Sequence, residues 1–152
     1  MLVIGRDTGF SAAKTWKQWF EDVNGSDTRV EFTGPVSDED LVRLWQRIGI
    51  IIVPSRYESF GLTVIEGFSR ARAVVTTRAA ALPEVAGGGA ILVEPDNSIQ
   101  LSQAIISLIS DRTEIERAAV RGYEVYLKSY TPEIFAERVM ELYRAIAGKS
   151  GR

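Results

Sequence analysis

The chain of 152 residues carries 45% hydrophobic and 25% charged residues, a balance that fits one globular domain and excludes a disordered or fibrous protein. It holds neither cysteine nor histidine, which excludes disulfides, thiolate chemistry and the commonest general base and metal ligand. The formal net charge of −2 gives no broad basic surface, so we expect no nucleic acid as a partner.

Short apolar runs alternate with amphipathic stretches, the order typical of an α/β protein whose parallel strands are joined by helices. We expect five strands, at Leu2–Gly5, Val30–Gly34, Ile50–Pro54, Ala73–Thr77 and Ala90–Val93. The longest apolar run, Ile48–Val53, is far too short to span a bilayer. The opening residues also lack the basic segment and long apolar stretch of a signal peptide, so we expect a cytoplasmic location.

The segments between and after these strands carry apolar residues at helical spacing. Ser37, followed by three acidic residues, is typical of a capped helix start, and Thr131 with Pro132 opens the last helix. That helix carries an apolar face and needs a surface to cover. We therefore expect a domain over residues 1–129, a C-terminal crossover helix over residues 130–148 and a disordered tail over residues 149–152.

The most informative segment covers residues 54–66 and reads Pro-Ser-Arg-Tyr-Glu-Ser-Phe-Gly-Leu-Thr-Val-Ile-Glu. It follows a wholly apolar strand and runs into a helix. In an open parallel sheet, ligands bind beyond the carboxyl ends of the strands, so this loop lies where a site is expected. Gly61 lets the backbone approach a ligand closely, and the amides of the first helical turn, near Phe60 to Thr63, can receive a diphosphate.

Two glutamates flank this helix start. Glu58 lies in the loop, and Glu66 lies about one turn inside the helix, with its side chain leaning back toward the same end. A carboxylate can accept hydrogen bonds from two neighbouring hydroxyls, which sugar and ribose rings both present. The alternative is that Glu66 only complements the helix dipole and that Glu58 is a solvated loop residue.

The segment resembles the Glu-seven-residues-Glu signature of the large family of retaining GT-B glycosyltransferases, which includes sucrose synthases, bacterial glycogen synthases and cell-envelope mannosyltransferases. The similarity extends over nearly the whole chain, in order and in spacing. It includes the strands Leu2–Gly5 and Val30–Gly34, the short Pro-Glu helix Leu82–Val85 and the glycine-strand-proline element Gly88–Pro95. The resemblance implies the C-terminal domain of a GT-B fold, truncated at its N-terminus, with a Rossmann-like parallel sheet of about five strands and helices on both faces.

Carried over residue by residue, the resemblance implies that Glu58 contacts the hydroxyls of the donor sugar and that Glu66 contacts the nucleotide ribose. The diphosphate would be bound by backbone amides of Ser59, Phe60, Gly61 and Leu62, with Thr63 nearby. The nucleobase would be flanked by Gly34, Pro35, Val36 and Ser37, largely through backbone groups. In such enzymes the sugar keeps its anomeric configuration, and the acceptor hydroxyl attacks from the face that the diphosphate leaves. Glu58 is then a catalytic residue that positions the donor and is not a nucleophile.

The resemblance also implies partners and a cellular role. The donor substrate would be a nucleotide sugar, with no cofactor and no essential metal, in polysaccharide or glycoconjugate biosynthesis. An N-terminal acceptor domain, absent from this chain, would complete the active site, so the isolated chain is expected to be inactive. Peripheral membrane association is expected only through that domain, and self-association through the C-terminal helix stays open.

Several positions depart from the family pattern. An Arg and a Lys that clamp the diphosphate in the family lie upstream of the region that this chain covers, and we assign no role to Arg56, Arg70, Arg72 and Arg78. Ala71 and Ala73 stand where glycine and proline are usual. The turn at Ala79–Ala81 replaces a glycine-rich one.

Other functions fit parts of the pattern. A glycoside hydrolase would need the two glutamates to flank a bond, whereas they share one loop-helix unit. A nicotinamide-binding protein would need Gly-x-Gly-x-x-Gly, which Gly5–Gly9 does not provide. The acids of Asp38–Asp40 mimic a metal-binding Asp-x-Asp, although at a helix start they compensate the dipole. A noncatalytic module that binds a nucleotide or a partner protein stays open.

Overall fold

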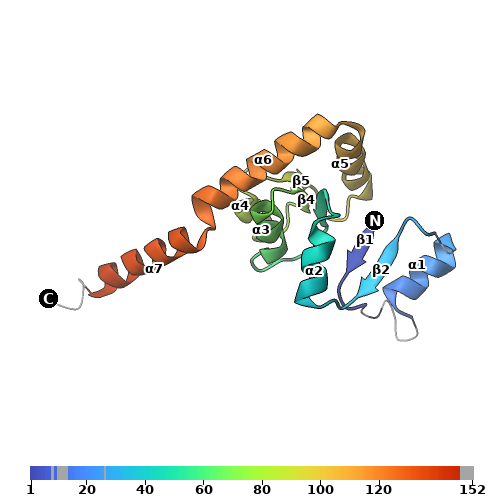
Figure 1. Ribbon diagram of the computed structural model, residues 1–152, viewed down its shortest axis with the longest axis horizontal. Coiled ribbons are helices and arrows are strands. Elements are labelled where there is room, and N and C mark those ends of the chain that lie inside the picture. Colours follow the sequence, from blue (N-terminus) through green and yellow to red (C-terminus); the bar gives the residue numbers. More distant parts are fainter. Residues whose placement is uncertain (8, 10–13, 26, 148–152) are drawn as a thin grey trace. The chain divides into compact units, whose positions relative to one another are not determined.

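The computed structural model describes residues 1–7, 9, 14–25 and 27–147, and Figure 1 shows the order of its elements. The chain divides into two compact units, Met1–Arg47 and Ile48–Arg152, which are described separately. The first unit contains β1 (Leu2–Ile4), α1 (Trp16–Asn24), β2 (Glu31–Gly34) and α2 (Asp38–Trp45). Strands β1 and β2 pair in parallel, with Leu2 opposite Glu31.

The second unit holds the remaining elements. They are β3 (Ile50–Val53), α3 (Leu62–Ser69), β4 (Ala73–Thr77), α4 (Leu82–Ala86), β5 (Ile91–Val93), α5 (Ser98–Ser110), α6 (Arg112–Ser129) and α7 (Pro132–Ala147). Strand β4 is the middle strand of a parallel sheet in the order β3-β4-β5. Ile50 lies opposite Ala73, and Val75 lies opposite Ile91.

The α/β class with parallel strands is therefore confirmed. Each of the five expected strands is present, with bounds that differ by at most one residue at an end, and they pair as a two-stranded and a three-stranded sheet. Ser37 caps α2, and Thr131 accepts a hydrogen bond at the start of α7, as expected. Gly148, at the end of the expected C-terminal helix, and the expected tail lie outside the described residues.

Strand β4 is buried along its whole length, which is typical of a parallel strand covered on both faces. Ala73 and Val75 pack with Leu108 of α5 and Ala118 of α6. Because side chains alternate along a strand, Val74 faces the other side, where α3 approaches so closely that a Cβ on Gly67 would lie 2.9 Å from the Val74 Cγ2. The core of the second unit thus fixes α3 against the sheet.

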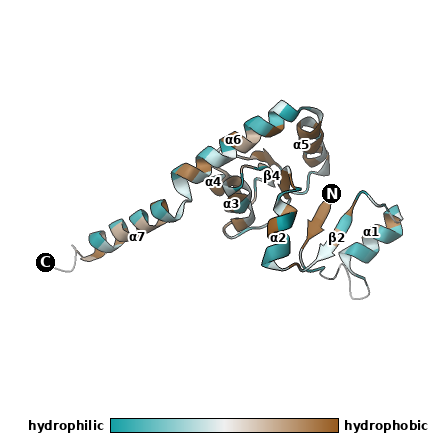
Figure 2. Cartoon of the chain, in the orientation of Figure 1, coloured by the Kyte–Doolittle hydropathy of each residue, from teal (hydrophilic) through white to brown (hydrophobic). Residues whose placement is uncertain are grey.

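Helix α7 has no buried residue. Hydrophobic and hydrophilic residues alternate around it (Figure 2), and its apolar residues Phe135, Leu142 and Ile146 are exposed. The apolar face that the sequence predicted for this helix is therefore present, and none of its residues is buried. No helix among the described residues combines the length and the apolarity that crossing a membrane requires.

Candidate functional site

The loop between β3 and α3 is anchored to the carboxyl edge of the three-stranded sheet. Two threonines of β4 hold its first residues: the Thr76 hydroxyl donates to the Val53 carbonyl at 2.9 Å, and the Thr77 hydroxyl donates to the Ser55 carbonyl at 2.5 Å. Both threonines are buried. A buried hydroxyl needs a partner, so these bonds fix the direction in which the loop leaves the sheet.

Glu58 is held by a turn from a different part of the chain. The Ala81 amide donates to the Glu58 carbonyl at 3.3 Å. The turn that presents this amide contains Ala80 in the left-handed conformation, with φ +46°. Alanine rarely adopts this conformation, which glycine reaches without strain. The Glu58 side chain itself is half-buried.

Gly61 opens α3 in a conformation that only glycine adopts readily. Its φ is +91° and its ψ is 42°. A Cβ at this position would lie 3.1 Å from the Leu82 Cδ2 and 3.6 Å from the Val85 Cγ1, both of α4. The residue is buried, and its carbonyl accepts from the Val64 amide at 3.0 Å. Gly61 therefore lets α4 pack directly beneath the start of α3.

The first turn of α3 is open to solvent. Phe60 is 52% exposed, Leu62 is 64% exposed and Thr63 is exposed. Within the part of the chain that the structure describes, the Leu62 and Thr63 amides have no hydrogen-bond acceptor. Helix termini leave such amides without an intrahelical partner, and together with the dipole they attract anions.

The other helices of eight or more residues begin differently, so far as the chain is described. A side-chain oxygen accepts from an amide at each of their starts. These oxygens belong to Thr15, Ser37, Asn97, Asp111 and Thr131. Gly61 has no side chain to do the same for α3. The start of α3 is thus the one terminus of this group that its own residues leave uncapped.

Glu66 lies about one turn into α3, with an exposed side chain. Helical side chains lean toward the N-terminus of their helix, so the carboxylate can reach the side of the terminus opposite the loop. The structure thus places the Glu58 side chain beside Gly61 and Glu66 about one turn into α3, with the segment Ser59–Thr63 between them in the chain. A ligand with a central anionic group and hydroxyls on both sides fits this arrangement.

The four residues expected at the nucleobase, Gly34, Pro35, Val36 and Ser37, belong to the first unit and form the connection from β2 to α2. Gly34 has φ +67°. The Ser37 hydroxyl accepts from the Asp40 amide at 3.2 Å, which places Asp38–Asp40 in the first turn of α2. The three acidic residues therefore lie at a helix start, as the sequence predicted.

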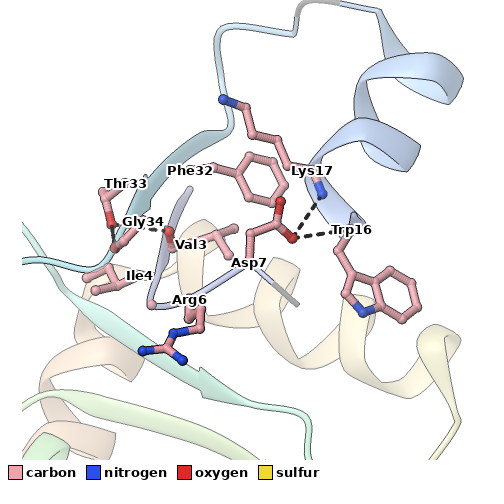
Figure 3. Close-up of a pocket in the computed structure, with 10 residues that line it drawn as sticks. Val3, Ile4, Arg6, Asp7, Trp16, Lys17, Phe32, Thr33 and Gly34 are labelled. Carbon is pink, nitrogen blue, oxygen red and sulfur yellow. Dashed lines mark hydrogen bonds between the residues drawn. The ribbon is translucent and has the colours of Figure 1, made fainter. Parts of the chain in front are cut away.

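The first unit also contains a cavity of about 410 Å³ at the carboxyl ends of β1 and β2. The Asp7 carboxylate accepts from the Trp16 amide at 3.1 Å and from the Lys17 amide at 3.4 Å. Figure 3 draws both bonds as dashed lines. The start of α1 is thus occupied by a carboxylate of the chain itself. The sequence analysis interpreted Gly5–Gly9 only as a turn and did not predict this cavity. The position of Gly5 directly after a strand could have indicated it.

Among the described residues, no three Asp, Glu, His or Cys side chains lie close enough together to hold a metal ion. The Glu58 and Glu66 carboxylates belong to one loop-helix unit and are suited to accept hydroxyl donors. Metal independence stays a prediction from the sequence.

Comparison with known proteins gives a consistent result. The family model described as glycosyl transferases group 1 matches residues 1–111. The chain is 31% identical to the D-inositol 3-phosphate glycosyltransferase of Corynebacterium diphtheriae over 117 residues, which are 76% of this chain and 27% of that protein. It is 33% identical to the O-antigen chain mannosyltransferase B of Escherichia coli over 93 residues, which are 61% of this chain and 24% of that protein.

Among solved structures, the chain is similar to HepE of Anabaena in complex with UDP, with a TM-score of 0.80 and 20% identity. The match covers 95% of this chain and 40% of HepE, and this similarity concerns the fold. The chain thus spans between about a quarter and two fifths of the length of these proteins.

Proposed function

Because the chain belongs to the glycosyl transferases group 1 family, as the C-terminal domain of a GT-B glycosyltransferase, we propose that it binds a nucleotide sugar at the start of α3 and forms the donor half of a retaining hexosyltransferase. The observation that carries this proposal is the open first turn of α3, with exposed Leu62 and Thr63; Glu58 precedes this turn and Glu66 follows it in the chain. UDP is the first nucleotide to test, because HepE was solved with UDP and with UDP-glucose.

Different residues of this segment bind different parts of the ligand. The amides of Ser59–Thr63 bind the diphosphate, since uncapped helical amides favour negative charge. Glu58 accepts from hydroxyls of the sugar, and Glu66 accepts from hydroxyls of the ribose.

The transfer itself breaks the bond between the anomeric carbon and the diphosphate oxygen, and the nucleoside diphosphate leaves with the electron pair. The acceptor oxygen bonds to the anomeric carbon on the same face, and its proton passes to the departing phosphate oxygen. The chain's residues orient the donor and stabilise the leaving charge through backbone amides. Since an acceptor-binding domain must supply the second substrate, we propose that the transfer takes place in a larger protein, in the cytoplasm and without a metal.

Calorimetric titration with UDP, GDP and ADP tests the binding step. We expect one of the three to bind saturably, and Glu66→Ala to weaken its binding about ten-fold, as is typical for the loss of hydrogen bonds to a charged group. Glu124→Ala, which removes an exposed carboxylate from α6, is the matched control. Equal binding by the wild type and Glu66→Ala would refute the ribose role. If the longer protein that includes the acceptor domain binds the nucleotide but transfers no sugar, a noncatalytic nucleotide-binding module is favoured.

A further inference from the structure

Two exposed arginines follow neighbouring strands of the three-stranded sheet. Arg56 lies in the loop after β3, and Arg78 directly follows β4. The two strands are parallel, with Val53 opposite Thr76, so both arginines lie at the carboxyl edge of the sheet. The loop that carries Arg56 continues through Glu58 to the start of α3. These guanidinium groups and the proposed donor site therefore share one edge of the sheet.

Each arginine is paired with a carboxylate from the connection between β5 and α5. The Arg56 Nε donates to the Asp96 Oδ1 at 2.6 Å, and the Arg78 Nε lies 3.3 Å from the Glu94 Oε1. The Arg78 amide also donates to the Val93 carbonyl at 2.9 Å, which keeps Arg78 beside Glu94. Both pairs are exposed, with 82% of the Arg56 side chain and 54% of the Arg78 side chain accessible. Exposed ion pairs are weak, so another anion can displace these carboxylates.

The proposed donor site needs cations. Glu58 and Glu66 are both acidic, and the diphosphate is itself an anion. The start of a helix contributes the equivalent of only about half an elementary charge. A guanidinium group can donate two parallel hydrogen bonds to a phosphate and remains charged at every accessible pH.

We propose that Arg56 and Arg78 bind the diphosphate of the donor, and that Asp96 and Glu94 occupy the two guanidinium groups when no donor is present. This inference rests on the proposed donor site. Binding of the donor replaces each carboxylate by a phosphate oxygen, with no change in the charge state of any group. The connection between β5 and α5 is thereby released from the edge of the sheet when the donor binds.

The exchange predicts opposite effects for the two members of each pair. Arg56→Gln removes a cation and should weaken UDP binding about ten-fold, the loss typical of a charged hydrogen bond. Asp96→Asn removes the competing carboxylate and should strengthen UDP binding about two- to five-fold, the range expected for an exposed ion pair. In the second pair, Arg78→Gln should likewise weaken UDP binding and Glu94→Gln should strengthen it. An ion pair that only ties two loops together would instead give weaker binding with either substitution.

Calorimetric titration with UDP measures these constants, and uridine serves as the ligand without phosphate. Arg112→Gln is the matched control, because Arg112 is an exposed arginine that pairs with Glu116 at 3.2 Å on α6. The wild type and Arg112→Gln should bind UDP equally. The inference is overturned if the wild type and Glu66→Ala differ as expected while Arg56→Gln and Arg78→Gln bind like the wild type, or if Asp96→Asn weakens binding. Failure of the wild type to bind any nucleoside diphosphate overturns the proposed function with it.

Discussion

Glu58 lies directly against Gly61: a Cβ on Gly61 would stand 3.8 Å from the Glu58 Cγ. The side chain that is proposed to hold the sugar and the residue that opens α3 are therefore neighbours in space. The same hypothetical Cβ would stand 3.1 Å from the Leu82 Cδ2. Any side chain at position 61 must displace one of these groups, so the shape of the site depends on glycine here.

Gly61→Ala should lower the free energy of unfolding by about 2 kcal/mol or more, because alanine is strained at φ +91° and its methyl group crowds Leu82. Gly88→Ala is the matched control: its φ is +85°, but nothing lies within 4 Å of the added Cβ. Urea denaturation of both variants separates the backbone cost from the steric cost. Equal losses in the two variants would show that contact with α4 contributes nothing.

Gly122→Ala should destabilise the second unit by about 1–3 kcal/mol, the usual cost of overpacking a core. A Cβ on Gly122 would come 2.5 Å from the Cδ1 of Phe68, which is fully buried. Replacement of glycine by alanine inside a helix normally stabilises by about 1 kcal/mol, so the sign of the effect is diagnostic. The urea midpoint gives this sign, and a midpoint above that of the wild type would contradict the close packing of α3 on α6.

Ala80→Gly should stabilise the protein by up to about 1 kcal/mol, because Ala80 has φ +46° and glycine reaches this conformation without strain. The Ala81 amide keeps its bond to the Glu58 carbonyl, so UDP binding should not change. Thermal unfolding and calorimetry measure the two quantities. Loss of stability, which glycine causes at ordinary backbone positions, would show that Ala80 is not strained.

Tyr130 links the end of α6 to α4, since its hydroxyl donates to the Val85 carbonyl at 3.1 Å. Burial, with Glu84 nearby, raises the pKa of Tyr130 above its ordinary value of 10.0. A raised pKa favours the neutral phenol in the folded state. The contribution of the Tyr130 hydroxyl to the free energy of unfolding is therefore complete below pH 10. It is lost as the pH rises through the pKa of Tyr130 in the folded protein.

Tyr130→Phe should cost about 1 kcal/mol at neutral pH, the typical net contribution of one hydrogen bond. The difference in urea midpoint between this variant and the wild type should then shrink above pH 10. Tyr143→Phe, at an exposed position of α7, controls for the loss of a hydroxyl. A difference that stays constant up to pH 12 would contradict the assignment.

The strands and the loop-helix unit could be predicted from the sequence because their signals are local. The apolar run Ile50–Val53 and the glycine before Leu62 act within a few residues. The pairing of the strands as two plus three depends on contacts between distant segments, which no local pattern encodes. The left-handed conformation of Ala80 was likewise hidden, because alanine seldom adopts it.

The ion pairs of Arg56 and Arg78 could not be predicted either. Arg56 and Asp96 are 40 residues apart, and only the parallel order β3-β4-β5 brings their loops to the same edge. Nothing in the sequence distinguishes an exposed arginine that pairs with a carboxylate from one that contacts only solvent. The proposed site residues from Glu58 to Glu66 were thus visible in the sequence, whereas the ion pairs between loops depend on the order of the strands in the sheet.

The central claim is that the open start of α3 receives the diphosphate of a nucleotide. Backbone amide chemical shifts, followed by NMR during titration with UDP and with uridine, test it most directly. We expect the largest shifts at Ser59–Thr63 with UDP, with saturation, and much smaller shifts at these amides with uridine. Saturable UDP binding that leaves the Leu62 and Thr63 amides unmoved would contradict the claim.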